Sequence, residues 1–248
     1  MKKVVVFLMV CFVALSARVA QAQTITFTDT VKYWPGWGNG TPDDTMDTIG
    51  IPNFTGGQAV VNNGLLTSLT FNRAAGSTSY WGVLSPGDLF IDLGANGNWD
   101  YVVDLTSWGS AGANNPDAGN GNYNLYAINL ALDSSSGYIK SGSDNTGDWK
   151  GYNIRDNHPV AADILWNPNG GTIGFTGWGD GSTTSYTFNL NGLNLGSSGQ
   201  FAIGWMPNCA NDVIYETLKY TPVPEPATMS LLGLGLFGLI GLKNRRKA

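Results

Sequence analysis

The segment Thr24-Ile25-Thr26-Phe27-Thr28 alternates threonine with large apolar residues. Successive side chains of a β-strand point to opposite faces of the sheet, so the threonines share one face while Ile25 and Phe27 share the other. Because a sheet with one apolar face must cover that face with another layer, the segment predicts a layered β structure.

Similar short runs follow along the chain, separated by stretches rich in Gly, Asn and Asp, which turns favour. The predicted strands are Thr24 to Val31, Leu65 to Phe71, Asp88 to Asp92, Asp100 to Leu105, Tyr123 to Leu132, Asp163 to Trp166, Thr172 to Phe175, Thr183 to Leu190, Phe201 to Trp205 and Asp212 to Tyr220. No segment between the two ends of the chain shows a helical period. We therefore predict an all-β fold, with a single β-sandwich domain of jelly-roll-like type at residues 23–221. An immunoglobulin-like unit is the alternative, although the strand count is high for it.

The amino terminus has the three parts of a secretory signal peptide. Lys2-Lys3 is the positive region, Val4 to Leu15 is almost entirely apolar, and Ala20-Gln21-Ala22 has the small-x-small pattern that signal peptidase accepts. We predict cleavage after Ala22, which makes residues 1–22 a signal peptide. The apolar run is too short for the alternative, a transmembrane anchor.

Residues 222–248 combine a proline-rich segment, an apolar run and a basic end. The apolar part, residues 227–242, has a length of roughly 24 Å as a helix at about 1.5 Å per residue, so we predict a short transmembrane helix. By the positive-inside tendency the basic end stays in the cytoplasm, which leaves residues 23–221 outside the inner membrane. A plain proline-rich linker before an anchor is the alternative interpretation.

The sequence VPEPATMSLLGLGLFGLIGLKNRRKA, residues 223–248, resembles a PEP-CTERM sorting tail. In that family the tail is similar in logic to the LPXTG signal of Gram-positive bacteria, and an exosortase, a membrane protease-transpeptidase, is the expected processing enzyme. The resemblance implies a Gram-negative, exopolysaccharide-producing bacterium and delivery to the cell surface or extracellular matrix, with anchoring in the inner membrane before sorting. It makes Pro224, Glu225 and Pro226 the recognition residues of the motif, acted upon and not catalytic.

The charge of the body limits its partners. Residues 24–224 contain six Lys or Arg and 17 Asp or Glu, a net charge of −11. Nucleic acids and anionic lipids bind to basic surfaces, so we expect no nucleic-acid partner. Because Cys11 lies in the predicted signal peptide, Cys209 has no partner for an intramolecular disulfide. Its expected role is that of a small buried apolar residue, with intermolecular pairing as the alternative.

The loop from Asp92 to Asp100 has oxygen donors at a regular spacing, as in the first half of an EF-hand calcium loop. The candidate ligands are Asp92, Asn96, Asn98 and Asp100. The pattern departs from an EF-hand at Gly94, the third position, and at Val103, where a glutamate would close the shell. Calcium is the only cofactor that this pattern suggests, and the competing interpretation is a β-hairpin connection built on Asn-Gly chemistry.

Two glycine-rich segments each contain a tryptophan, Trp37 in Gly36 to Gly40 and Trp178 in Gly177 to Gly181. We interpret both as the same turn chemistry used twice. Stacking of exposed Trp37 and Trp178 on a glycan is the alternative.

The chain offers few catalytic residues. His158 is the one histidine, no Gly-x-Ser-x-Gly elbow occurs, and the usual zinc ligands are scarce. Glu216 and an aspartate could serve as a glycosidase pair, but the alternation around Glu216 predicts that it faces outward. We therefore expect no enzymatic activity. The leading hypothesis is a non-catalytic structural protein of the cell surface or biofilm matrix; a carbohydrate-binding module, calcium-assisted and gripping exopolysaccharide, is the alternative, and a glycoside hydrolase is third.

Overall fold

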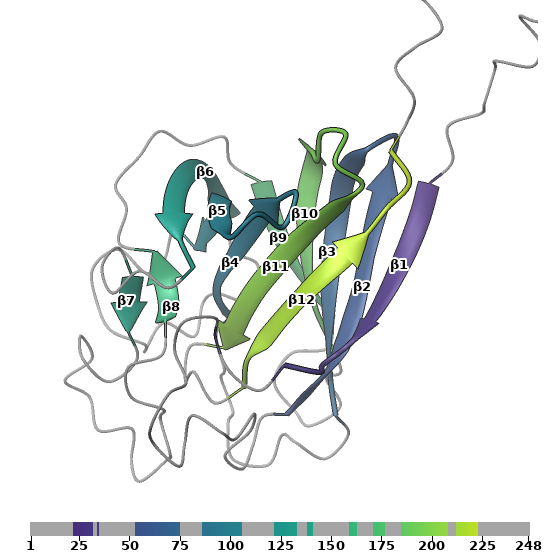
Figure 1. Ribbon diagram of the computed structural model, residues 1–248. Coiled ribbons are helices and arrows are strands. Elements are labelled where there is room, and N and C mark those ends of the chain that lie inside the picture. Colours follow the sequence, from purple (N-terminus) through teal and green to yellow (C-terminus); the bar gives the residue numbers. More distant parts are fainter. Residues whose placement is uncertain are drawn as a thin grey trace, which may run out of the picture. The chain divides into compact units, whose positions relative to one another are not determined.

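The computed structural model describes residues 22–31, 34, 53–74, 86–105, 122–132, 138–140, 159–162, 171–176, 185–207 and 212–222. These residues form the strands β1 (Ala22–Thr28), β2 (Phe54–Asn62), β3 (Leu65–Arg73), β4 (Pro86–Leu93), β5 (Asn98–Leu105), β6 (Asn122–Ala131), β7 (Tyr138–Lys140), β8 (Pro159–Ala162), β9 (Gly171–Thr176), β10 (Ser185–Asn194), β11 (Gln200–Pro207) and β12 (Ile214–Lys219) (Figure 1). They belong to one compact unit, Ala22–Thr221.

The strands form two antiparallel layers. Hydrogen-bonded neighbours follow the order β1-β2-β3-β10-β9-β6-β5-β4-β11-β12, and β7 pairs with β8 separately. Between β9 and β6 the pairing is limited to Asn122 with Thr172 and Tyr123 with Gly171, and here the sheet folds over. We call β1-β2-β3-β10-β9 the first layer and β6-β5-β4-β11-β12 the second layer. The all-β sandwich expected from the sequence is confirmed.

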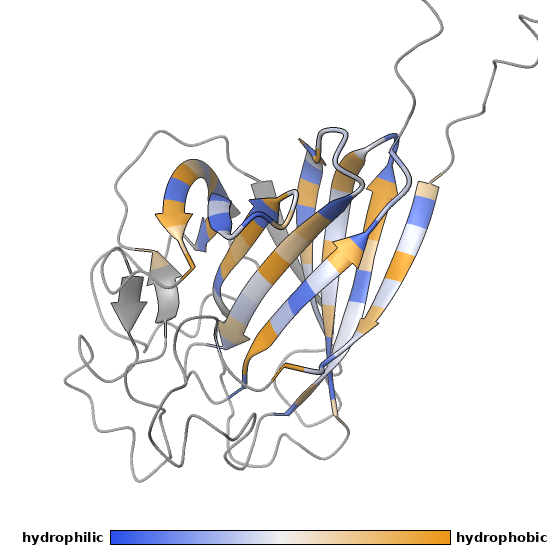
Figure 2. Ribbon diagram, viewed as in Figure 1, coloured by the Kyte–Doolittle hydropathy of each residue, from blue (hydrophilic) through white to orange (hydrophobic). Residues whose placement is uncertain are grey.

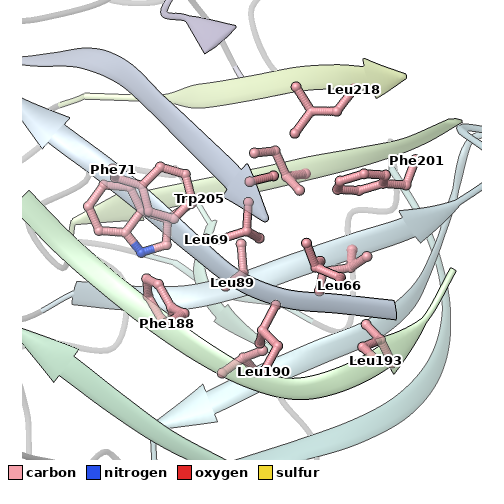
Figure 3. Packing of buried hydrophobic residues seen from close by; sticks show 14 of the residues in the cluster. Leu66, Leu69, Phe71, Leu89, Phe188, Leu190, Leu193, Phe201, Trp205 and Leu218 are labelled. Carbon is pink, nitrogen blue, oxygen red and sulfur yellow. The ribbon is translucent and has the colours of Figure 1, made fainter. Parts of the chain in front are cut away.

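The apolar faces of the two layers meet in an aromatic core. Trp205 of the second layer stacks on Phe71 of the first, with ring centroids 4.6 Å apart and an interplanar angle of 12° (Figure 3). Phe54 meets the same indole edge-on at 4.8 Å, and Trp205 Nε1 donates a hydrogen bond to the Gly87 carbonyl at 3.1 Å. Alternating hydropathy along β1 and β10 shows why these strands bury one face only (Figure 2).

The second layer also carries a cluster on its outer face. The cluster contains Trp34, Phe90, Trp99, Val102, Tyr126, Ala162, Met206 and Val213. A Cβ on Gly204 of β11 would lie 2.6 Å from Cη2 of Trp99 and 2.7 Å from Cη2 of Trp34, so the missing side chain gives these two indoles their space. The Ala162 amide donates to Asp88 Oδ2 at 2.9 Å and ties β8 to β4. The second layer is therefore packed on both faces.

Strand β2 was not predicted from the sequence. It contains Gly56-Gly57, which weakens a strand pattern, yet both glycines allow close approach of neighbouring backbone: added Cβ atoms would lie 2.2 Å from the Phe27 carbonyl oxygen and 1.8 Å from that of Thr70. The β2–β3 turn is Asn63-Gly64, with φ angles of 56° and 75°. This is the backbone of a tight two-residue hairpin, and the Asn-Gly pair was the available signal.

Other strand predictions differ at their ends. Strand β1 ends at Thr28 and not at Val31, and the short strands β7 and β8 were not predicted. The predicted strand at 163–166 lies outside the described residues. Short strands such as β7 and β8 carry too few side chains for a period to be visible.

Side chains connect β1 and β12, the two ends of the strand order. Thr30 donates to Glu216 Oε1 through its amide at 3.0 Å and its hydroxyl at 2.7 Å, and the Thr221 amide donates to Gln23 Oε1 at 2.9 Å. The prediction that Glu216 faces outward is wrong, because it shares its side of β12 with buried Ile214 and Leu218. Its position at the sheet edge lets the carboxylate reach across to Thr30.

Candidate functional site

The β4–β5 loop gathers the polar residues that the sequence marked as a candidate calcium site. Strand β4 ends at Leu93, β5 begins at Asn98, and the chain turns between them through positive φ angles at Gly94 (82°), Ala95 (53°) and Gly97 (95°). Two of these positions are glycines, which adopt such angles without steric cost. The tight path brings both flanking aspartates close to the backbone of the loop.

Both aspartates accept hydrogen bonds from that backbone. Asp92 is fully buried; its Oδ1 accepts from the Asn96 amide and its Oδ2 from the Gly97 amide, each at 2.9 Å. Asp100 Oδ2 accepts from the Leu93 amide at 2.6 Å. Each carboxylate therefore supplies the acceptor that a buried backbone N–H group requires.

The two asparagines act within the same loop. Asn96 Oδ1 accepts from the Asn98 amide at 3.1 Å, and Asn96 Nδ2 donates to the Leu93 carbonyl at 3.2 Å. Side-chain bonds of this type to nearby backbone are characteristic of Asx turns. The structure thus brings Asp92, Asn96, Asn98 and Asp100 together, with bonding partners supplied by the loop itself.

The metal hypothesis stays a prediction. Within the part of the chain that the structure describes, no group of three or more His, Cys, Asp or Glu side chains is arranged to hold a metal ion. The candidate calcium ligands comprise two carboxylates and two amides, which form hydrogen bonds with backbone groups and with one another.

A second pair of aspartates, Asp88 and Asp104, flanks this loop and was not predicted from the sequence as part of a site. The β4–β5 pairing ends at Leu89 with Val103, and Asp88 and Asp104 are the next residues on the two strands beyond that pair. Burial raises the pKa of Asp104 to about 6, because the charged form loses hydration. The available signal was the symmetrical spacing of Asp88, Asp92, Asp100 and Asp104 about the loop.

Two tyrosines complete the electrostatics of the second layer. Burial raises the pKa of Tyr215, and the negative charge of Asp92 raises it further. Burial also raises the pKa of Tyr123 to about 12, and its hydroxyl donates to the Asn189 carbonyl. The raised pKa values keep both phenols neutral well above neutral pH.

Several predicted site residues lie outside the described residues. They are Ala20, Trp37, His158, Trp178, Cys209, Pro224, Glu225 and Pro226. Ala22 is described: it opens β1 and pairs with Asn62 of β2. Signal-peptide cleavage after Ala22 stays a prediction, as does glycan stacking by the two tryptophans.

The carboxyl terminus matches a known family of sorting signals. Residues 222–247 match the PEP-CTERM protein-sorting motif. The chain carries a PEP-CTERM sorting motif. The resemblance seen in the sequence is confirmed, and the motif implies processing by an exosortase and sorting of an exported protein to the surface.

The comparisons do not extend to the body of this PEP-CTERM protein. No curated protein and no solved structure matches the chain. The predicted membrane helix at 227–242 lies outside the described residues, and none of the residues that are described belongs to a helix long and apolar enough to cross a membrane.

Proposed function

We propose that this PEP-CTERM protein is a non-catalytic structural component of the surface or exopolysaccharide matrix of a Gram-negative bacterium. Its PEP-CTERM motif supports export and sorting, with the inner membrane as an intermediate location. The body then remains outside the cell as a β-sandwich, and its role is to provide a stable folded unit in the matrix.

The non-catalytic part of the proposal depends on one observation: aspartate side chains in the second layer accept hydrogen bonds from backbone amides. Asp92 and Asp100 hold the β4–β5 loop, and Asp88 ties β8 to the second layer. A catalytic acid or base must instead be free to exchange a proton with a substrate. Side chains engaged with backbone donors favour a structural role.

The body's single glutamate supports the same conclusion. A glycoside hydrolase needs two carboxyl groups that flank its substrate. Glu216 of β12 accepts two hydrogen bonds from Thr30, two residues beyond the end of β1. This arrangement favours a role in closing the sandwich over a role in hydrolysis.

The sorting part is tested by intact mass. We expect the protein from the medium of an exosortase-containing host to end near Pro224, and the triple variant Pro224→Ala, Glu225→Ala, Pro226→Ala to keep Ala248 and stay in the envelope. Pro222→Ala is the matched control, because it removes a proline outside the Pro-Glu-Pro triad. Secretion of the triple variant with the wild-type mass would overturn this part.

The structural part is tested with the exported protein and purified matrix polysaccharide. We expect no new reducing ends after prolonged incubation. We also expect a deletion strain to lose matrix cohesion and to regain it with the Glu216→Gln variant, which keeps an oxygen acceptor for Thr30. Release of reducing ends that Glu216→Gln abolishes would establish a hydrolase.

A further inference from the structure

The outer face of the first layer carries rows of uncharged polar side chains, interrupted by the partly exposed Val60 opposite Thr24. The strand registers place Thr26 opposite Gln58, Gln58 opposite Thr70, and Thr70 opposite Thr187. Thr24 and Thr28 share the same side of β1, and both are exposed. We call Thr24, Thr26, Thr28, Gln58, Thr70 and Thr187 the threonine face.

Charge is absent from this face in the described strands. Among the residues of β1, β2, β3, β9 and β10 the one charged residue is Arg73, which is 8% exposed and lies on the core side of β3. The body as a whole carries a net charge of −11. In the described strands this face is therefore uncharged; Thr24, Thr26, Thr28 and Gln58 are exposed, and Thr70 and Thr187 are partly buried.

The hydroxyl groups are held in fixed positions. Neighbouring strands are about 4.8 Å apart, and side chains on one face of a strand recur about every 6.6 Å. Threonine is stiff at χ1, and the hydroxyls of Thr70 and Thr187 lie 3.0 Å apart in a hydrogen bond. A partner therefore meets donors and acceptors that lose little side-chain entropy on binding.

These properties select one class of partner. An anionic polymer or a second copy of this chain would be repelled by the net negative charge, and the face has no cation to offset that repulsion. Hydroxyl and amide groups act as both donors and acceptors, which matches a polymer whose surface consists of hydroxyl groups. Aromatic side chains are absent from the threonine face, so hydrogen bonding is the available interaction.

We propose that the threonine face binds a neutral polysaccharide, with sugar hydroxyls replacing water across the rows of Thr26, Gln58, Thr70 and Thr187. The inference rests on the proposed matrix role, because the matrix would provide such a polymer. It adds which surface of the protein contacts that polymer. It differs from stacking by Trp37 and Trp178, because it predicts binding without those residues.

The test is affinity electrophoresis of the exported protein in native gels that contain hydroxyethylcellulose, dextran or alginate. We expect a neutral polymer to retard the wild type and alginate to leave its mobility unchanged. The triple variant Thr26→Val, Thr70→Val, Thr187→Val keeps β-branched shape and removes three hydroxyls. We expect it to weaken binding at least tenfold with an unchanged melting temperature.

Two further variants make the test selective. Thr217→Val removes an exposed hydroxyl from β12 of the second layer and should bind as the wild type does. Gln58→Lys places a bulky charge at the centre of the threonine face and should abolish binding even if the valine variant aggregates.

Three results would overturn the inference: no retardation of the wild type by either neutral polymer, wild-type binding by the triple valine variant, or a dimer that this variant dissociates. None of these results bears on sorting, which the intact mass measures separately.

Discussion

The second layer of the sandwich is buried on both faces, whereas the first layer is buried on one face and meets solvent with the other. Trp205 and Gly204 are neighbours on β11, and one packs into the core while the other lies beneath Trp34 and Trp99. In the first layer, buried and exposed side chains also alternate, but the outer positions are exposed threonines such as Thr26. Both layers therefore supply the central core, the second layer packs on its outer face as well, and the first layer supplies a polar surface.

The two layers also differ in the number of charged residues in their strands. The second layer contains Asp88, Asp92, Asp100, Asp104, Glu216 and Lys219 in its strands, whereas the first layer contains Arg73. Most of these acids form hydrogen bonds to backbone, so the charged layer uses its charges internally. The uncharged layer instead presents hydroxyl and amide groups, among them the hydrogen-bonded pair Thr70 and Thr187.

The largest effect is expected for Trp205→Ala. The variant loses the stacking on Phe71, the edge contact with Phe54 and the hydrogen bond to Gly87. We expect the free energy of unfolding in urea to fall by about 4 kcal/mol. Leu65→Ala, at an exposed position on β3, is the control and should change it by less than about 0.5 kcal/mol. Equal effects of the two variants would contradict the division between core and surface.

Gly204→Ala tests the outer packing of the second layer. The new methyl group collides with Trp34 and Trp99, and we expect a loss of about 2–3 kcal/mol in the free energy of unfolding. In a Trp99→Phe background the closest ring atom is missing, so the same substitution should cost less. If the changes in the free energy of unfolding caused by Gly204→Ala and Trp99→Phe are fully additive, the Trp99 indole does not restrict the space at residue 204.

Asp92→Ala tests whether the β4–β5 loop depends on its carboxylate. The variant leaves the amides of Asn96 and Gly97 without their acceptor, and we expect a loss of about 1–3 kcal/mol in the free energy of unfolding. EDTA should leave the wild-type melting temperature unchanged. A rise in that temperature with calcium, lost in Asp92→Ala, would instead support the calcium hypothesis.

Asp104→Asn should stabilise the protein at neutral pH. Burial raises the folded-state pKa of Asp104 to about 6, above its unfolded value, so its contribution to stability is greatest at low pH and is lost as the pH rises from about 4 through 6. After allowance for solvent screening, we expect Asp104→Asn to gain about 1–2 kcal/mol at pH 7. Thermal unfolding at pH 4 and pH 7 measures this gain, and an equal gain at both pH values would refute the assignment.

The sandwich was predictable because its strands alternate, as Ile25 and Phe27 show in β1. Strand β2 was missed because Gly56-Gly57 breaks the alternation for a reason visible only in three dimensions, the approach of the neighbouring backbones. The sequence placed Asp92, Asn96, Asn98 and Asp100 in one loop between two strands, and their role as metal ligands stays a prediction. That its carboxylates bond to backbone depends on positive φ angles at Gly94 and Gly97, which spacing alone does not reveal.

The threonine face could also be predicted only in part from the sequence. One row of it was visible in Thr24, Thr26 and Thr28, but the registers that add Gln58, Thr70 and Thr187 join strands far apart in the chain. The orientation of Glu216 was predicted wrongly because the outer side of β12 was assigned to it, although it alternates in step with the buried residues Ile214 and Leu218. At the sheet edge its carboxylate reaches Thr30.

We infer that the doubly packed second layer holds the fold together while the first layer presents a surface. Amide hydrogen exchange of the exported protein, resolved by residue, tests it most directly. We expect the amides of β4 and β11 to exchange most slowly, at the rate of global unfolding, and those of β1 and β2 to exchange faster through local opening. Slower exchange in β1 and β2 than in β4 and β11 would contradict the claim.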